Sequence, residues 1–250
     1  MSCAVVVCGM DTRYKLWVPF KHGFDKYWPD CPWDKYFITN LIKGPVGFKT
    51  IITGHETSWG NKAIRALMQI DTDIVFFLME DAWLPGPVDT EAMVKFYKIM
   101  MDNPKIDHIR MVPPTIETGT VSQRKELTQE SPYDARLWSF KMDAEWRASI
   151  MAPFWRRRSL LSYLSVGQSV WDFEDSAGAL SSRRDTEHLC CIDPHVFPLP
   201  HRTNPYQTVK DEMVTKGRWN KAAYEYIKKE QLAMNFKVHP NGEPNEDKLF

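Results

Sequence analysis

The chain has 250 residues, and its 32 basic and 32 acidic side chains leave no net charge at pH 7. A balanced charge provides no overall attraction for nucleic acid or for an anionic membrane surface. No apolar run approaches the roughly 20 residues that span a bilayer, and no signal-peptide pattern opens the sequence. We therefore expect a cytoplasmic protein in which residues 1–240 form a single domain and residues 241–250 a flexible tail.

Strand-like and helix-like segments alternate along the first half of the chain. Runs rich in β-branched and aromatic residues predict strands at 3–8, 34–40, 48–53 and 74–81. Apolar residues at helical spacing predict a helix at 58–69, with Ser58 or Thr57 as its N-cap, and another at 87–101, with Asp89 as its cap. A strand at 108–112 follows, and the polar stretch 115–131 predicts a loop or lid.

The second half continues this alternation less regularly. We expect further strands within 138–154, a short helix at 156–164 and an amphipathic helix at 217–232. Strands that alternate with helices favour an α/β fold, with a Rossmann-like, mostly parallel central sheet flanked by helices. The five cysteines show no C-x-x-C spacing, so they favour neither a disulfide framework nor a zinc site.

Two adjacent carboxylates, Glu80 and Asp81, end the apolar run that begins at Ile74. An unbroken apolar run predicts a central strand buried on both faces. Its carboxylates would then lie at the carboxyl edge of the sheet, where open α/β folds bind ligands. Two acids there suit a divalent cation with a phosphorylated substrate. The alternative is that they only begin a loop or cap the next helix.

Several segments together resemble small bacterial and phage glycosyltransferases of the GT-A type. They are Cys8–Phe20, Lys26–Pro32, Thr39-Asn40, Ser58-Trp59, the strand that ends in Glu80-Asp81, Trp171–Glu174 and Lys216–Trp219. The resemblance covers most of the chain. One departure is Glu80, because the family strand usually ends in two aspartates.

The resemblance implies a nucleoside-diphosphate sugar as donor, with a UDP-sugar expected, bound together with Mn²⁺ or Mg²⁺. The donor-binding residues would be Asp11, Arg13, Tyr14, Thr39, Asn40, Arg65 and Glu80. The metal ligands would be Asp81, Glu80 and a histidine, His201 or alternatively His195.

Ordinary structural roles compete with several of these assignments. Asp11 could simply form a turn, and Tyr14 could be a core residue. Lys62 could approach the diphosphate beside Arg65, but a solvated helix face is the favoured interpretation for it.

A second acidic segment, Trp171–Asp175, resembles the place where related enzymes hold their catalytic base. Sugar transfer needs a carboxylate that takes the proton of the acceptor hydroxyl. Glu174 is the predicted base and Asp172 the second candidate. The alternative makes Asp172 an N-cap and Glu174 a first-turn residue favoured by the helix dipole.

The sequence leaves the acceptor open between two classes. The basic clusters Arg156–Arg158 and Arg183-Arg184 could follow a phosphate backbone, which favours a hydroxymethylated base in phage DNA and then a location in the host cytoplasm. The neutral net charge slightly favours a surface-glycan precursor.

A non-catalytic nucleotide-sugar-binding module is the alternative to an enzyme. No G-x-G-x-x-G follows the first strand, which argues against a dehydrogenase. The sequence does not set the donor sugar or the oligomeric state.

Overall fold

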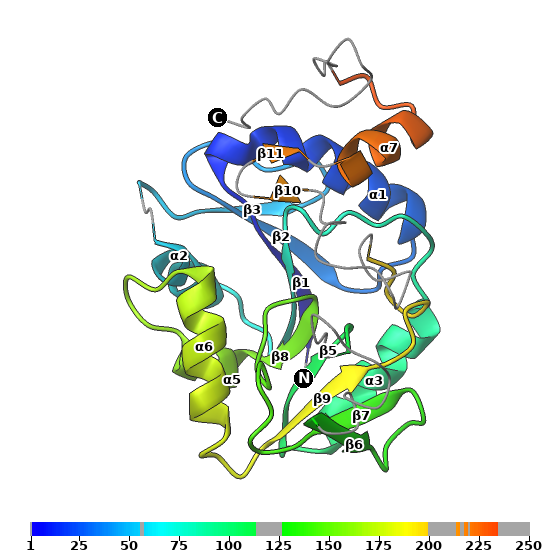
Figure 1. Cartoon of the computed structure of the whole chain (residues 1–250). Helices are drawn as coiled ribbons and strands as arrows, with labels where there is room; N and C mark the ends of the chain where they lie inside the picture. The colour runs from blue at the N-terminus through cyan, green and yellow to red at the C-terminus, as the bar shows by residue number, and fades with distance from the viewer. Residues whose placement is uncertain are drawn as a thin grey trace.

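The computed structural model describes residues 2–55, 58–113, 127–199, 214–215, 218–219 and 221–234 (Figure 1). The predicted tail at 241–250, most of the predicted lid and His201 lie outside these residues. Among the described residues, no helix is both long and apolar enough to cross a lipid bilayer.

One nine-stranded sheet organises the described residues, in the order β3-β2-β1-β4-β8-β5-β9-β7-β6. All of its strands except β8 and β7 run in one direction. The predicted α/β class, with a mostly parallel central sheet flanked by helices, is confirmed. The strands are β1 (Cys3–Cys8), β2 (Asp34–Thr39), β3 (Lys49–Ile52), β4 (Ile74–Met79), β5 (Ile106–Arg110), β6 (Thr128–Glu130), β7 (Leu137–Phe140), β8 (Pro153–Arg156) and β9 (Glu187–Cys191); β10 (Val214–Thr215) and β11 (Arg218–Trp219) form a separate pair.

Helices cover both faces of the sheet (Figure 1). A 3₁₀ segment, η1 (Asp11–Leu16), leads into the first helix. The helices are α1 (Trp17–Tyr27), α2 (Trp59–Leu67), α3 (Thr90–Asp102), α5 (Arg157–Tyr163), α6 (Val170–Ser181) and α7 (Lys221–Lys229). The predicted caps are confirmed, because Ser58 accepts a hydrogen bond from the Asn61 amide and Asp89 accepts one from the Ala92 amide.

The two faces of the central strands build two separate cores. Successive side chains of a strand point to opposite faces, so β1 contributes Val5 to one core and Val6 to the other. The first core also takes apolar side chains from α1, α3 and α7, and the second takes them from α2, α5 and α6. The apolar residues of β4 are buried on both sides, as predicted for a central parallel strand.

Candidate functional site

The strands β1, β2 and β4 end at one edge of the sheet and bring three loops together. The Gly9 amide donates to the Ile38 carbonyl at 3.0 Å, and the Glu80 amide donates to the Cys8 carbonyl at 3.3 Å. The loop after β1, the end of β2 and the acid pair after β4 are therefore neighbours. This is the carboxyl edge, at which open parallel sheets bind ligands.

Asp11 fastens the loop after β2 to the loop after β1. Its carboxylate accepts hydrogen bonds from the backbone amides of Asn40, Leu41 and Ile42 at 2.7–3.1 Å. These bonds give Asp11 a structural role between two loops that are distant in sequence, and its contact with a nucleotide stays a prediction. Tyr14, in η1, is 54% exposed, so the alternative that places it in the core is wrong.

Lys62 lies under these loops and not on a solvated helix face, so that interpretation of the sequence is wrong. The side chain is buried, and Nζ donates to the Gly9 carbonyl at 2.6 Å and to Asn40 Oδ1 at 3.0 Å. The loops after β1 and β2 thus share one ammonium group. Arg65, one helical turn further, donates from Nη1 to the Thr53 carbonyl, while Thr39 is buried at the end of β2.

The carboxyl group of Glu80 is the most unusual polar group at this edge. The residue is 1% exposed, and neither carboxyl oxygen has a hydrogen-bond partner within the described residues. The nearest cation is Arg13, whose Nη1 lies 3.8 Å from Oε1. Burial, and then the charge of Asp81, raise the pKa of Glu80 to about 8. A buried acid without hydrogen bonds is costly and marks a site that a ligand could complete.

Asp81 lies beside it, half-buried, in the turn that follows β4. Burial raises the pKa of its carboxyl group too. Two adjacent carboxyl groups whose charged forms are disfavoured fit a divalent cation, since a cation would stabilise both charges. Asp81 and Glu80 are the residues that would hold it.

A third ligand does not come from the described part of the chain. No group of three or more His, Cys, Asp or Glu side chains gathers there with a geometry for metal binding. His195 is exposed, and its amide donates to Asp193. The predicted ligand His201 lies outside the described residues.

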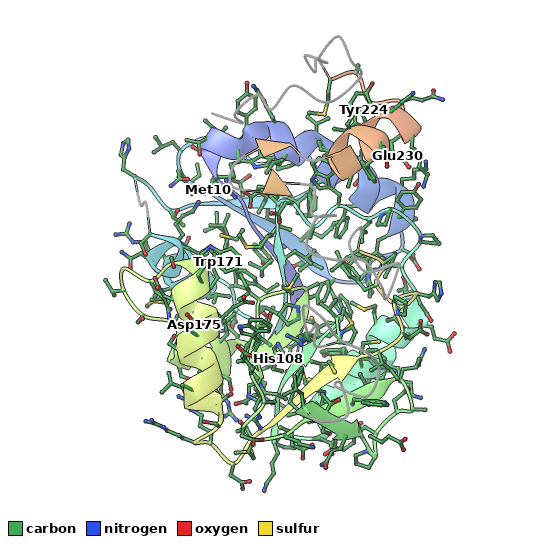
Figure 2. All side chains as sticks on the ribbon, in the orientation of Figure 1. Met10, His108, Trp171, Asp175, Tyr224 and Glu230 are labelled. Carbon is green, nitrogen blue, oxygen red and sulfur yellow. The ribbon has the colours of Figure 1, made fainter. Side chains whose placement is uncertain are left out.

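Helix α6 carries the predicted catalytic acids, and Figure 2 labels Trp171 and Asp175 on it. Ser169 is its N-cap and forms a capping box with Asp172, whose carboxylate accepts from the Ser169 amide at 2.9 Å. Asp172 therefore stabilises the start of α6, although Ser169 and not Asp172 is the cap. Trp171 is 74% exposed.

Glu174 reaches from α6 to the segment that precedes β8. Its Oε1 accepts from Ser149 Oγ at 2.6 Å and from the Ile150 amide at 3.3 Å. Because β8 runs antiparallel beside β4, this segment enters the sheet at the carboxyl end of β4. Glu174 therefore contacts this segment, while its approach to Glu80 and Asp81 stays a prediction.

A pocket of about 370 Å³ lies between α6 and residues 142–146. Residues that line it are Met142, Asp143, Ala144, Glu145, Trp146, Glu174, Asp175, Gly178, Ala179 and Ser182. Sequence reasoning missed the contribution of 142–146. Its signal was an aromatic side chain among acids, Asp143, Glu145 and Trp146, between two predicted strands.

The arginine cluster at 156–158 lies at the other end of the sheet. Arg156 pairs in register with Ile74, the first residue of β4, whereas the acid pair follows the last. The guanidinium of Arg156 donates to the carbonyls of Ile106, Asn103 and Met100, and that of Arg157 to those of Thr72 and Leu67. These two arginines bind the protein's own backbone.

No family model matches the chain, and no curated protein matches it. Solved structures match at low similarity. Staphylococcus aureus TarS 1–349 in complex with UDP-GlcNAc has a TM-score of 0.44 at 12% identity, over 77% of this chain and 56% of that one. A UDP-glucose pyrophosphorylase complexed with UDP-glucose has a TM-score of 0.48 at 7% identity, over 77% and 90%.

The bifunctional IspDF of Campylobacter jejuni has a TM-score of 0.42 at 13% identity, over 72% of this chain. The chain spans 47% of the length of IspDF and 58% of TarS 1–349. At these similarities the matches assign neither a family nor a substrate. The function is therefore argued from the residues of this chain.

Proposed function

We propose that the protein is a glycosyltransferase that moves a sugar from a nucleoside diphosphate to an acceptor hydroxyl. The observation that carries the proposal is the position of Glu80, a buried acid without hydrogen bonds that is followed by a second acid at the carboxyl edge of the sheet. A divalent cation that accompanies the donor diphosphate would supply the polar partner that the Glu80 carboxyl group lacks within the described residues. A uridine nucleotide is the proposed carrier.

Residues around the pair fit the parts of such a donor. Arg13, on η1, lies close to Glu80 and could contact a phosphate, which guanidinium groups bind through paired hydrogen bonds. The exposed ring of Tyr14 offers a stacking surface for the base. A cation held by Asp81 and Glu80 would neutralise the charge that develops on the leaving nucleoside diphosphate.

Glu174 is the proposed catalytic base. Its Oε1 is held by Ser149 and Ile150, and the carboxylate lines the pocket, which leaves Oε2 for an acceptor hydroxyl. As the hydroxyl oxygen forms a bond to the anomeric carbon, the bond from that carbon to the phosphate oxygen breaks. The hydroxyl proton passes to Glu174, and the nucleoside diphosphate leaves with the electron pair.

Release of nucleoside diphosphate from a panel of nucleotide sugars, with Mn²⁺, with Mg²⁺ or with EDTA, tests the proposal. We expect release of nucleoside diphosphate only when the cation is present. The variant Asp81→Asn should abolish this release, and the exposed control Asp102→Asn should leave it unchanged. Binding of nucleotide sugar without release from any donor would instead identify a non-catalytic binding module.

A further inference from the structure

We propose that the pocket between α6 and residues 142–146 binds the acceptor, and that this acceptor is a saccharide without phosphate or carboxylate groups. The inference rests on the proposed glycosyl transfer and names the acceptor class that it uses. It also separates the two classes that the sequence leaves open.

The pocket lies beside the proposed transfer site. Arg110 is the last residue of β5, and its Nη1 donates to the Trp146 carbonyl at 3.3 Å. Trp146 is thereby placed at the carboxyl end of β5, and only β8 separates β5 from β4. Neighbouring strands lie about 4.8 Å apart, and in register Arg110 lies level with Phe77, two residues before the end of β4, so the ends of β4 and β5 are separated by roughly 12 Å. Glu174 lines the pocket and reaches the segment between these ends.

The charge of the lining selects against anionic acceptors. Four of the lining side chains are carboxylates, those of Asp143, Glu145, Glu174 and Asp175, and none of the lining residues is basic. A cleft lined by one sign of charge repels ligands of the same sign. Carboxylates are also hydrogen-bond acceptors, so they pair well with hydroxyl donors.

The remaining lining residues suit a sugar ring. Trp146 is 38% exposed and takes a left-handed backbone conformation with φ of 50°, which is rare for a bulky residue. The hydrogen bond from buried Arg110 holds this strained residue at the pocket. An indole has an apolar face and a polar edge, while Gly178 and Ala179 leave space on α6 one helical turn beyond its acids. The volume is in the range of small-molecule sites.

A duplex nucleic acid fits this surface poorly. Arg156 and Arg157 are committed to backbone carbonyls at the opposite end of the sheet. Arg184 donates to Ser162 and stacks on Tyr163. Arg183 is exposed and follows the lining residue Ser182, at the end of the pocket that is about 13 Å from Glu174 at 1.5 Å per residue. A phosphate backbone would meet the four carboxylates first.

Ligand-observed NMR on the full chain at pH 7 tests the inference with three probes: a neutral nitrophenyl hexoside, the matching nitrophenyl hexuronide and a nitrophenyl hexoside 6-phosphate. We expect the neutral probe to bind at least about 10-fold more tightly than either anionic probe. This ratio corresponds to about 1.4 kcal/mol of unfavourable interaction with the anionic group. The double variant Asp143→Asn/Glu145→Gln should reduce that ratio to about threefold or less. The matched control, Asp102→Asn/Glu130→Gln, removes the same charge from exposed positions outside the pocket and should leave the ratio unchanged.

Equal or tighter binding of an anionic probe, or no binding of any probe, would overturn the inference. So would displacement of the neutral probe by hydroxymethylated duplex DNA. The binding measurement needs no donor, and release of nucleoside diphosphate is measured without the probes, as donor hydrolysis in which water replaces the acceptor hydroxyl. Absence of release therefore contradicts the proposed function, and absence of saccharide binding contradicts the acceptor site.

Discussion

Glu80 and Asp81 are neighbours in sequence, yet the structure gives them different environments. Glu80 is buried without hydrogen bonds, and Asp81 is only half-buried in the next turn. In a metal-dependent donor site, Asp81 can approach a cation with little rearrangement. Burial instead disfavours the charged form of Glu80, and a cation bound nearby would favour it.

We predict that Glu80→Gln stabilises the protein in the absence of donor. The pKa of Glu80 is raised from 4.5 to about 8, so the unfolded state loses its proton first, and stability is lost as the pH rises from about 4.5 to about 8. The neutral amide removes this loss, which amounts to roughly 3 kcal/mol at pH 7. Urea unfolding of both proteins between pH 5 and pH 8 should show a difference that grows with pH. A difference that is constant with pH would contradict the prediction. Glu130→Gln, at an exposed position, is the control.

The two acids of α6 should separate catalysis from folding. Gln at position 174 can still accept from Ser149 and Ile150, so Glu174→Gln should keep the fold and the donor affinity while turnover falls by about 10²–10⁴-fold. Asp172→Asn perturbs the capping box and should cost about 0.5–1 kcal/mol of stability, with turnover within about twofold. Steady-state kinetics and thermal unfolding of both variants check this pair. Equal losses of turnover would place Asp172 in the chemistry.

Single residues show how far the sequence could predict the site. The acid pair was predicted at the end of an apolar strand and directly follows β4, whereas the catalytic role of Glu174, which the resemblance implies, stays a prediction. Lys62 was not predicted to be buried, because a lysine on an amphipathic helix is usually solvated. Its burial depends on two acceptors, the Gly9 carbonyl and Asn40, that are distant in sequence.

At the scale of elements, the first four strands were predicted to within two residues at each end, and the later strands less closely. Strand β1 has the predicted bounds, and β4 falls short of its predicted range only by the acid pair. Strand β9 escaped prediction because it is short and carries Glu187 and His188, although it is largely buried between β5 and β7. Helix α1 was also missed, although Trp17, Phe20 and Phe24 follow helical spacing. Pro19 and Gly23 interrupt the usual helical composition.

Helix α7 is held by a buried carboxylate that follows its last turn. Glu230 accepts from Tyr27 at 2.6 Å, from Lys26 at 2.7 Å and from His22 at 2.9 Å, all on α1. Burial alone would raise the pKa of Glu230, but these hydrogen bonds outweigh it and lower the pKa to about 2. The contact joins α7 to α1. Helix α1 directly follows η1, and η1 carries proposed donor-binding residues.

We predict that Glu230→Gln loosens α7. The charged form is favoured in the folded state, so its contribution is present above pH 4.5 and is lost as the pH falls from about 4.5 to about 2. At pH 7 the variant should lose up to about 3 kcal/mol. Hydrogen exchange should show faster exchange of α7 amides in the variant than in Glu225→Gln, whose side chain is exposed. Unchanged protection of α7 would show that the ionic contact does not hold it.

At the scale of the whole molecule, two buried histidines connect neighbouring strands of the sheet. His108 of β5 and His188 of β9 are fully buried, and their ring centroids lie 5.3 Å apart (His108 is labelled in Figure 2). Trp155 and Tyr163 pack around them. Burial lowers the pKa of both histidines well below 6.5, and nearby Arg110 and Arg147 act in the same direction.

We predict that these histidines lower stability as the pH falls from about 7 to 5, against the opposite contribution of Glu80 over the same range. The unfolded chain takes up protons near pH 6.5 while the folded chain does not, so stability falls as the pH drops below 6.5. Together the two histidines lower the free energy of unfolding by up to about 2.7 kcal/mol for each further unit by which the pH falls. Glu230 contributes only below about pH 4.5, which keeps the two effects apart.

His188→Phe should remove about half of the histidine contribution to the slope, because an aromatic ring of similar size fits among Trp155, Tyr163 and His108 without a group that titrates. Urea unfolding at pH 7.5, 6.5, 5.5 and 5.0 measures the slope, with the exposed His55→Asn as control. The variant can be less stable than the wild type at pH 7.5 because its packing differs. A smaller slope would still agree with the prediction, because only the slope reports the titration. An unchanged slope would mean that the acid sensitivity arises elsewhere, because no other change in the variant alters proton uptake in this range.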